Sequence, residues 1–195
     1  MNIKTLMRVS TTILRNCILK IYYGPRYKCT FLNSCSISTH ISIQKKSKLI
    51  IGKHLSSLAR LEIGVRNGGK CVIGDYVNFN KDCTIVCHEH ITIGDNCLFG
   101  PGCQVFDHDH DYTQTDIARK THFLTGSIEI GNGVWFGANC VILRNTKIGD
   151  NCVFGAGTII KGTYPPNTLV VQKREEVCKS ILCTKSRHFE LKYGK

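Results

Sequence analysis

Two short segments of the chain place histidines beside carboxylates: residues 87–90 read CHEH, and residues 107–111 read DHDHD. Imidazole titrates near neutral pH and a carboxylate can hold it in one tautomer, so such neighbours are suited to general base catalysis. On an extended strand, sequence neighbours point to opposite faces, whereas His108 and His110 share a face. The order of residues alone therefore does not establish which carboxylate contacts which histidine.

Other chemistry is compatible with the same histidines. Two histidines on one face are half of a zinc site, to which His88, His90 or His122 would supply the rest. A solvated loop without chemistry is a third interpretation. The chain has neither a glycine-rich phosphate loop nor a nucleophile elbow, and no Ser or Cys lies beside these histidines in an activating arrangement. Direct transfer of a group is therefore favoured over a covalent intermediate.

Both segments interrupt a ladder in which an apolar residue recurs at every sixth position. Its members are Ile73, Phe79, Ile85, Ile93, Phe99, Val105, Ile130, Phe136, Ile142, Ile148, Phe154 and Ile160. A helix repeats near 3.6 residues and a strand every two, so neither explains a period of six. Short strands separated by bends do, and three such units close one triangular coil of a parallel β-helix. We therefore predict an all-β fold of hexapeptide repeats, with the ladder inside and loop 106–127 protruding.

The cysteines follow the ladder. Cys83, Cys97, Cys103, Cys140 and Cys152 each lie four places after a ladder residue, and Cys71 has the same phase. We interpret them as small buried fillers of a tight corner, in place of disulfides or a metal cluster. The sequence contains no CxxC pair, so a reducing, cytoplasmic compartment is expected.

The net charge is concentrated at the ends of the chain. Residues 1–61 contain 11 Lys or Arg and no Asp or Glu. We divide the chain into a basic amphipathic N-terminal segment and cap (1–48), a β-helix (49–171) and a short closing helix and tail (172–195). The N-terminal segment is too short and too polar to cross a bilayer. A helix resting on the inner face of the membrane and a cap over the first coil are both expected, and they are compatible. No nucleic-acid-binding motif accompanies the charge.

A family resemblance lies in residues 130–139 (IGNGVWFGAN), 148–151 (IGDN), 155–157 (GAG) and 165–167 (PPN). Together with residues 78–80 and 91–95, these segments resemble the sugar O-acetyltransferases of the left-handed β-helix class, relatives of galactoside and maltose acetyltransferases. The DHDH sequence is most similar to capsule and lipopolysaccharide acetyltransferases. The resemblance covers roughly residues 72–170. It also implies that the coil is left-handed, which the six-residue spacing alone does not indicate.

The resemblance implies a homotrimer that uses acetyl-CoA, without a metal, to acetylate a hydroxyl of a sugar or glycan precursor of surface polysaccharide. It makes His108 the catalytic base in preference to His110, with Asp107 as its neighbour. The acceptor and the position acetylated are not determined by the sequence.

Further positions are implied for the two substrates. Asn80 corresponds to a residue that contacts the acceptor, and Trp135 either lies near donor and acceptor or packs at a corner. The expected coenzyme contacts are Ala138, Ala156, Lys161, Lys173 and Arg174. Residues 171–175 (VQKRE) depart from the family pattern, and only the two basic side chains there match the charge of a nucleotide phosphate.

Two other classes of protein remain as alternatives. A γ-type carbonic anhydrase would share the β-helix but requires a histidine pair separated by four residues, whereas the histidines here are separated by two within each cluster. A non-catalytic β-helix scaffold would not bind coenzyme A.

Overall fold

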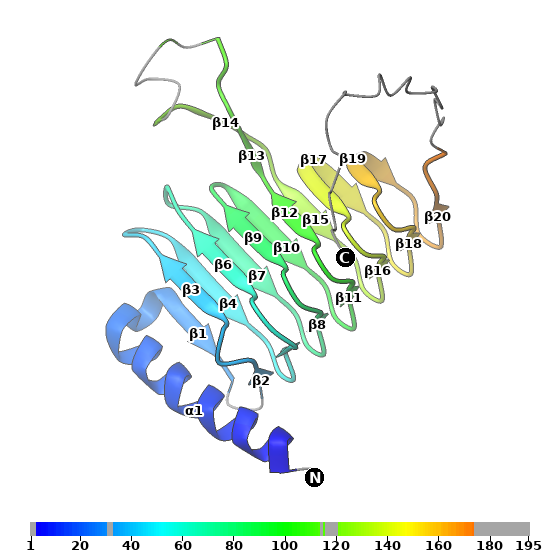
Figure 1. Ribbon diagram of the computed structural model, residues 1–195. Helices are drawn as coiled ribbons and strands as arrows, with labels where there is room; N and C mark the ends of the chain where they lie inside the picture. The colour runs from blue at the N-terminus through cyan, green and yellow to red at the C-terminus, as the bar shows by residue number, and fades with distance from the viewer. Residues whose placement is uncertain (1–2, 31–32, 114, 116–120, 174–195) are drawn as a thin grey trace, which may run out of the picture.

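The protein is described by a computed structural model over residues 3–30, 33–113, 115 and 121–173. Its parallel strands stack along three sides of a β-helix (Figure 1), as the six-residue ladder predicts. The first side contains β1 (Tyr27–Cys29), β4 (Lys48–Ile51), β7 (Lys70–Ile73), β10 (His90–Ile93) and β15 (Ile128–Ile130). The closing helix expected after residue 173 lies outside the described residues.

The other two sides complete each coil. The second side contains β3 (His40–Ile43), β6 (Glu62–Val65), β9 (Thr84–Cys87) and β12 (Gln104–Phe106). Two longer strands, β17 (Val141–Ile148) and β19 (Ile159–Tyr164), run through both the second and the first side. The third side contains β2 (Ser34–Cys35), β5 (Ser56–Ser57), β8 (Asn78–Phe79), β11 (Leu98–Phe99), β16 (Trp135–Phe136), β18 (Val153–Phe154) and β20 (Leu169–Val170).

The ladder residues form the core. All of them are at most 3% exposed, which confirms their predicted place inside the coil. On the third side the rings of Phe79, Phe99, Phe136 and Phe154 stack with centroids 4.5, 4.7 and 5.3 Å apart. Burying each such side chain contributes roughly 1.5–3 kcal/mol. The repeat thus supplies one apolar layer per coil.

The cysteines of the ladder are buried, as predicted, and they also make hydrogen bonds. The thiol of Cys97 donates to Gly131 O at 3.2 Å, and that of Cys140 donates to Gly155 O at 3.2 Å. Thr158 occupies the equivalent place in a later hexad and donates to Gly155 O at 2.6 Å. A small side chain fits these positions, and where it is a thiol or a hydroxyl it also donates to a carbonyl group of a turn. The ten described cysteines are all free thiols.

Two of the three corners are regular. At the first, which joins the first side to the third, Asp75 accepts a hydrogen bond from Lys53 N and Asp95 accepts one from Asp75 N, each at 2.7 Å. Glycine is required there, because a Cβ on Gly94 would lie 2.6 Å from Gly131 O. The second corner joins the third side to the second, and its turns also stack directly, as in the 2.7 Å bond from Gly157 N to Ala138 O. We call these two the regular corners.

The third corner, from the second side to the first, is interrupted twice. It contains residues 88–89 on one coil and residues 107–127 on the next, and we call it the histidine corner. From it projects an antiparallel pair, β13 (His108–His110) and β14 (Phe123–Thr125), as the protruding loop predicted from the sequence (Figure 1).

The N-terminal end of the coil is covered by helix α1 (Ile3–Tyr23), which continues into the 3₁₀ turn η1 (Gly24–Arg26) (Figure 1). The helix contacts β1 and β2, the first strands of their sides. Coil strands therefore begin at Tyr27, inside the segment predicted as the N-terminal cap. Across the described ranges, no helix has both the length and the apolarity needed to cross a bilayer.

Candidate active site

The site is organised by the carboxylate of Asp107, which is fully buried at the histidine corner. Its oxygens accept hydrogen bonds from His88 N at 2.7 Å and from Glu89 N at 2.8 Å. The insertion in the previous coil exposes these two amides, and the carboxylate satisfies them. Burial alone would raise the pKa of Asp107, but His108 and the two amides outweigh it and hold that pKa below its usual value. The carboxylate is therefore ionised at neutral pH.

His108 lies against this charge. Its Nδ1 is 3.5 Å from Asp107 Oδ1, and its side chain is 13% exposed. That separation is longer than a hydrogen bond, so the attraction between the two groups is mainly electrostatic. Among the described residues, Nδ1 of His108 has no hydrogen-bond partner. The geometry thus places Nδ1 of His108 beside a buried negative charge.

A second histidine, His88, stacks on His108 with ring centroids 3.7 Å apart and an angle of 8° between the planes. The edge of Phe123 closes the stack, 4.4 Å from the His88 ring and 5.4 Å from the His108 ring. The amide of Asn67 lies 2.9 Å from His88 Nδ1. Burial, and then the charge of His108, lower the pKa of His88 to about 4, so its ring is neutral at pH 7.

Sequence reasoning placed His88 in a segment suited to base catalysis and named it as a possible zinc ligand, but missed its contact with His108. The sequence did contain a signal for this contact, since the two interruptions lie one coil apart at the same corner.

Arg144 was also missed. Its Nε lies 2.6 Å from Asp109 Oδ2 and ties β13 to β17 of the following coil. His110 is exposed, with its ring 4.8 Å from Phe123. His108 and His110 are therefore both close to the ring of Phe123, but only His108 lies against Asp107.

The residues expected to contact the two substrates do not all lie near the predicted catalytic residues. Asn80, Ala138 and Ala156 lie at the second corner, and Trp135 is 53% exposed on the third side. Lys161 is exposed in β19, where that strand passes the histidine corner, and Lys173 is exposed near the end of the described chain. Arg174 lies outside the described residues. Within a single chain, the second side separates the two groups.

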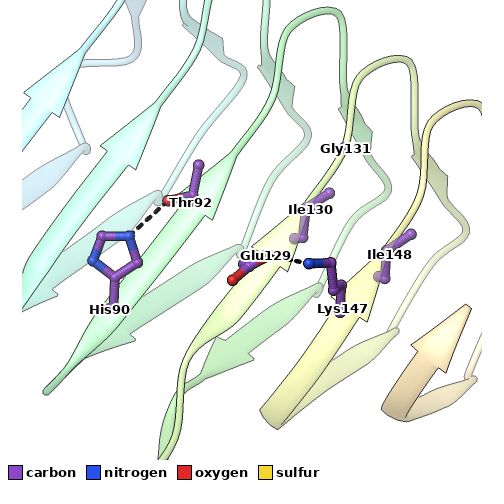
Figure 2. Close-up of a pocket in the computed structure, with 7 residues that line it drawn as sticks. All are labelled: His90, Thr92, Glu129, Ile130, Gly131, Lys147 and Ile148. Atoms are coloured by element: carbon purple, nitrogen blue, oxygen red, sulfur yellow. Dashed lines mark hydrogen bonds and ion pairs between the residues drawn. The ribbon is translucent and has the colours of Figure 1, made fainter.

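A separate shallow pocket of about 470 Å³ lies on the first side, over β10, β15 and β17 (Figure 2). His90 Nε2 and Thr92 Oγ1 are 3.0 Å apart there, and Lys147 Nζ is 3.0 Å from Glu129 Oε2. Its polar side chains are thus paired with one another (Figure 2). None of the predicted catalytic residues lines this pocket.

The arrangement gives no support to a zinc site. Rings stacked face to face cannot direct two nitrogen atoms at one ion, as His88 and His108 would have to do. Over the described part of the chain, no three His, Cys, Asp or Glu side chains form a cluster that could hold a metal ion.

Two segments of the repeat match known protein families. Residues 127–162 match the family described as "Bacterial transferase hexapeptide (six repeats)", and residues 90–105 match "Hexapeptide repeat of succinyl-transferase". The first match covers β15 to the middle of β19, and the second covers β10 to β12. These two segments of the chain therefore contain hexapeptide repeats similar to those of bacterial transferases.

Curated relatives include sugar O-acetyltransferases, as the resemblance indicated. Galactoside O-acetyltransferase of Escherichia coli is 38% identical over 94 residues, which are 48% of this chain and 45% of that protein. The chain thus spans less than half the length of this relative. "Putative lipopolysaccharide biosynthesis O-acetyl transferase WbbJ" of the same species is 26% identical over 145 residues, 70% of this chain and 74% of that protein.

A solved structure has the same fold. It is that of an N-acyltransferase from Bacillus cereus in complex with dTDP and coenzyme A. The TM-score is 0.64 at 17% identity, and the alignment covers 83% of this chain and 88% of the other. The two proteins thus share the β-helix fold over most of this chain.

Proposed function

We propose that this hexapeptide-repeat protein is an acetyl-CoA-dependent O-acetyltransferase that acts on a hydroxyl of a sugar or glycan precursor. The observation that carries the proposal is the imidazole of His108 beside the buried, ionised carboxylate of Asp107, 3.5 Å away. The relatives named as galactoside and lipopolysaccharide O-acetyltransferases support the reaction class.

In the proposed reaction, His108 accepts the hydroxyl proton while the sugar oxygen attacks the thioester carbonyl of acetyl-CoA. The carbon–sulfur bond then breaks, and the imidazolium returns the proton to the departing thiolate. Asp107 faces Nδ1 of His108 and stabilises the positive charge, so Nε2 is the atom that exchanges the proton. A positioned base of this kind contributes roughly 10²–10⁴-fold to the rate. His110 is the alternative base on the same strand.

We infer that the working unit is a homotrimer in which a neighbouring copy completes the site. The support is the division of the expected site between the histidine corner, with His108 and Lys161, and the second corner, with Asn80, Ala138 and Ala156. A copy that places its second corner against the histidine corner of its neighbour would unite them. The small side chains of the two alanines would leave room for an extended pantetheine, with Lys173 and Arg174 near the nucleotide phosphates.

We place the enzyme in the cytoplasm, in the biosynthesis of surface polysaccharide such as capsule or lipopolysaccharide. The relative named for lipopolysaccharide biosynthesis supports this role, and the free thiols suit a reducing compartment. Such glycan precursors are carried on the inner face of the membrane, so a peripheral contact there would bring enzyme and acceptor together.

The test is release of free thiol from acetyl-CoA by the purified protein, measured with and without each member of a panel of glycans. We expect release that depends on one class of glycan. If no glycan stimulates release and coenzyme A does not raise the melting temperature, the scaffold alternative holds. Stoichiometric zinc together with hydration of CO₂ would instead support the carbonic anhydrase alternative.

A further inference from the structure

Helix α1 turns a row of apolar side chains outward, while its contact side combines buried polar residues with Leu19 and Tyr23, which pack against the core. Thr12 and Asn16, on the side that contacts the coil, are 1% and 2% exposed. The outward side carries Met7, Leu14, Ile18 and Ile21, which are 63, 64, 57 and 85% exposed. We call these four residues the apolar stripe. Its exposure is the reverse of the usual pattern for a helix packed on a core.

Hydrogen bonds fix this orientation. Thr12 Oγ1 accepts from Cys35 N at 3.0 Å, at the open edge of the third side. Asn16 Oδ1 accepts from the hydroxyl of Tyr27 at 2.9 Å, and Arg15 Nη1 donates to Ser36 O at 3.1 Å. Turning the stripe inward would leave these buried or half-buried polar groups without partners. The exposed apolar surface is therefore a built feature of the cap.

The surface around the stripe is apolar and basic. Ile37, which is 82% exposed, extends it beyond the helix, and a groove of about 280 Å³ lies between Ile37, Leu14 and Ile18. Arg8 and Arg15 follow one flank of the stripe, between it and the contact side, where each is half-buried and donates to a backbone carbonyl of the coil. The first 61 residues contain 11 basic residues and no acidic residue.

We propose that the apolar stripe of α1 binds the surface of an anionic membrane, with the helix lying parallel to it. An apolar stripe with a basic flank on a 21-residue helix is the composition of an interfacial helix. The charge argues against a second copy as occupant, because a two-fold contact would bring two basic ends together. An anionic leaflet instead attracts every basic residue near it.

The arrangement would be multivalent in the proposed homotrimer, and this step depends on that assembly. If the three coils run parallel about a three-fold axis, all three copies of α1 lie at the same end. Three weak contacts on one rigid body then act together, which raises the apparent affinity well above that of one helix.

The experiment is flotation of the full-length protein with vesicles. Wild type should float with vesicles of phosphatidylcholine and phosphatidylglycerol at low salt, and should float far less with phosphatidylcholine alone or in about 0.5 M NaCl, where charges are screened within a few ångströms. Leu14→Gln with Ile18→Gln should lower partitioning at least about tenfold, because glutamine preserves the helix and removes apolar contact. The matched control is Leu169→Gln, which alters a side chain 69% exposed on the last strand of the third side.

Three outcomes would overturn the proposal. Wild type could fail to float with anionic vesicles at low salt, or the stripe variant could float as well as wild type and the Leu169 control. The stripe variant could also change the sedimentation coefficient in the absence of vesicles, which would assign the stripe to contact between copies. None of these readouts uses acetyl transfer, so failure here leaves the proposed enzyme activity untouched.

Discussion

The regular corners and the histidine corner both pair backbone amides with carboxylates, but they differ in how deeply the carboxylate is buried. At the first regular corner, Asp75 accepts from Lys53 N with a side chain that is 35% exposed. At the histidine corner, Asp107 accepts from two backbone amides and is fully buried. Water solvates the first charge, whereas the second is a buried negative charge with His108 beside it. A turn stabilised by a buried carboxylate can therefore also become a reactive site.

Removing the imidazole from the histidine corner should have the largest effect. His108→Ala is expected to lower turnover by a factor on the order of 10²–10⁴ with the assembly intact, because the proposed base is lost. Thiol release measures turnover, and sedimentation measures assembly. A fully active His108→Ala together with an inactive His110→Ala would transfer the role of base to His110.

Asp107→Asn tests the carboxylate itself. An asparagine oxygen can accept only at one side, and its NH₂ group would face the other backbone amide, so we expect a loss of about 1–3 kcal/mol in the free energy of unfolding. Asp75→Asn, at a regular corner with a side chain 35% exposed, should cost less than about 0.5 kcal/mol. Denaturant unfolding at one fixed protein concentration compares the two. Equal losses would show that the two kinds of corner do not differ.

The pH dependence of stability should differ between the corners because of His88. Its folded pKa of about 4 lies below the ordinary value of 6.5, so between these pH values the unfolded chain binds a proton that the folded chain does not. Stability is therefore full above pH 6.5 and falls as the pH is lowered toward 4. Asp107, whose pKa is lowered, contributes stability that is lost only as the pH falls below its unfolded value near 4.

His88→Gln should therefore reduce the loss of stability between pH 6.5 and 4, as measured by melting temperature across that range. The matched control is His54→Gln, which removes an exposed histidine from the first corner. An acid profile of His88→Gln identical to that of wild type would contradict a buried neutral ring.

The smallest effect is expected at the cysteines. Cys97→Ser keeps a donor that can reach Gly131 O, and Cys97→Ala removes it, so the alanine variant should be less stable than the serine variant by about 1 kcal/mol. Thermal unfolding of the two variants provides the comparison. If alanine is the more stable of the two, the thiol at this corner acts only as a filler.

The coil itself was predictable because its cause is periodic. Every ladder residue, from Ile73 to Ile160, is buried where the six-residue spacing places it. The same register correctly assigned Cys97 and Cys140 to the interior. A repeat places an apolar residue at the same position in many hexads, so a single departure such as residues 87–90 does not hide the pattern.

The partners within the site were harder to predict, because they belong to different coils. The contact of His88 with His108 depends on how two insertions of unequal length stack on each other, and local spacing does not contain that information. The same holds for Arg144 and Asp109, which are 35 residues apart. The amphipathic pattern of α1 likewise showed which residues share a face, but not that Thr12 and Asn16 would be the ones turned inward.

The number of strands stacked on the second side sets the distance between helix α1 and His108. His108 follows β12, which is three strand spacings beyond β3 in the order β3, β6, β9, β12. Neighbouring strands are about 4.8 Å apart and a helix is about 10 Å across, so a surface touching α1 lies on the order of 25 Å below His108. An acceptor anchored in that surface would have to present its hydroxyl at this height. The number of coils between α1 and the histidine corner would then set this distance, and only acceptors long enough to span it would be acetylated.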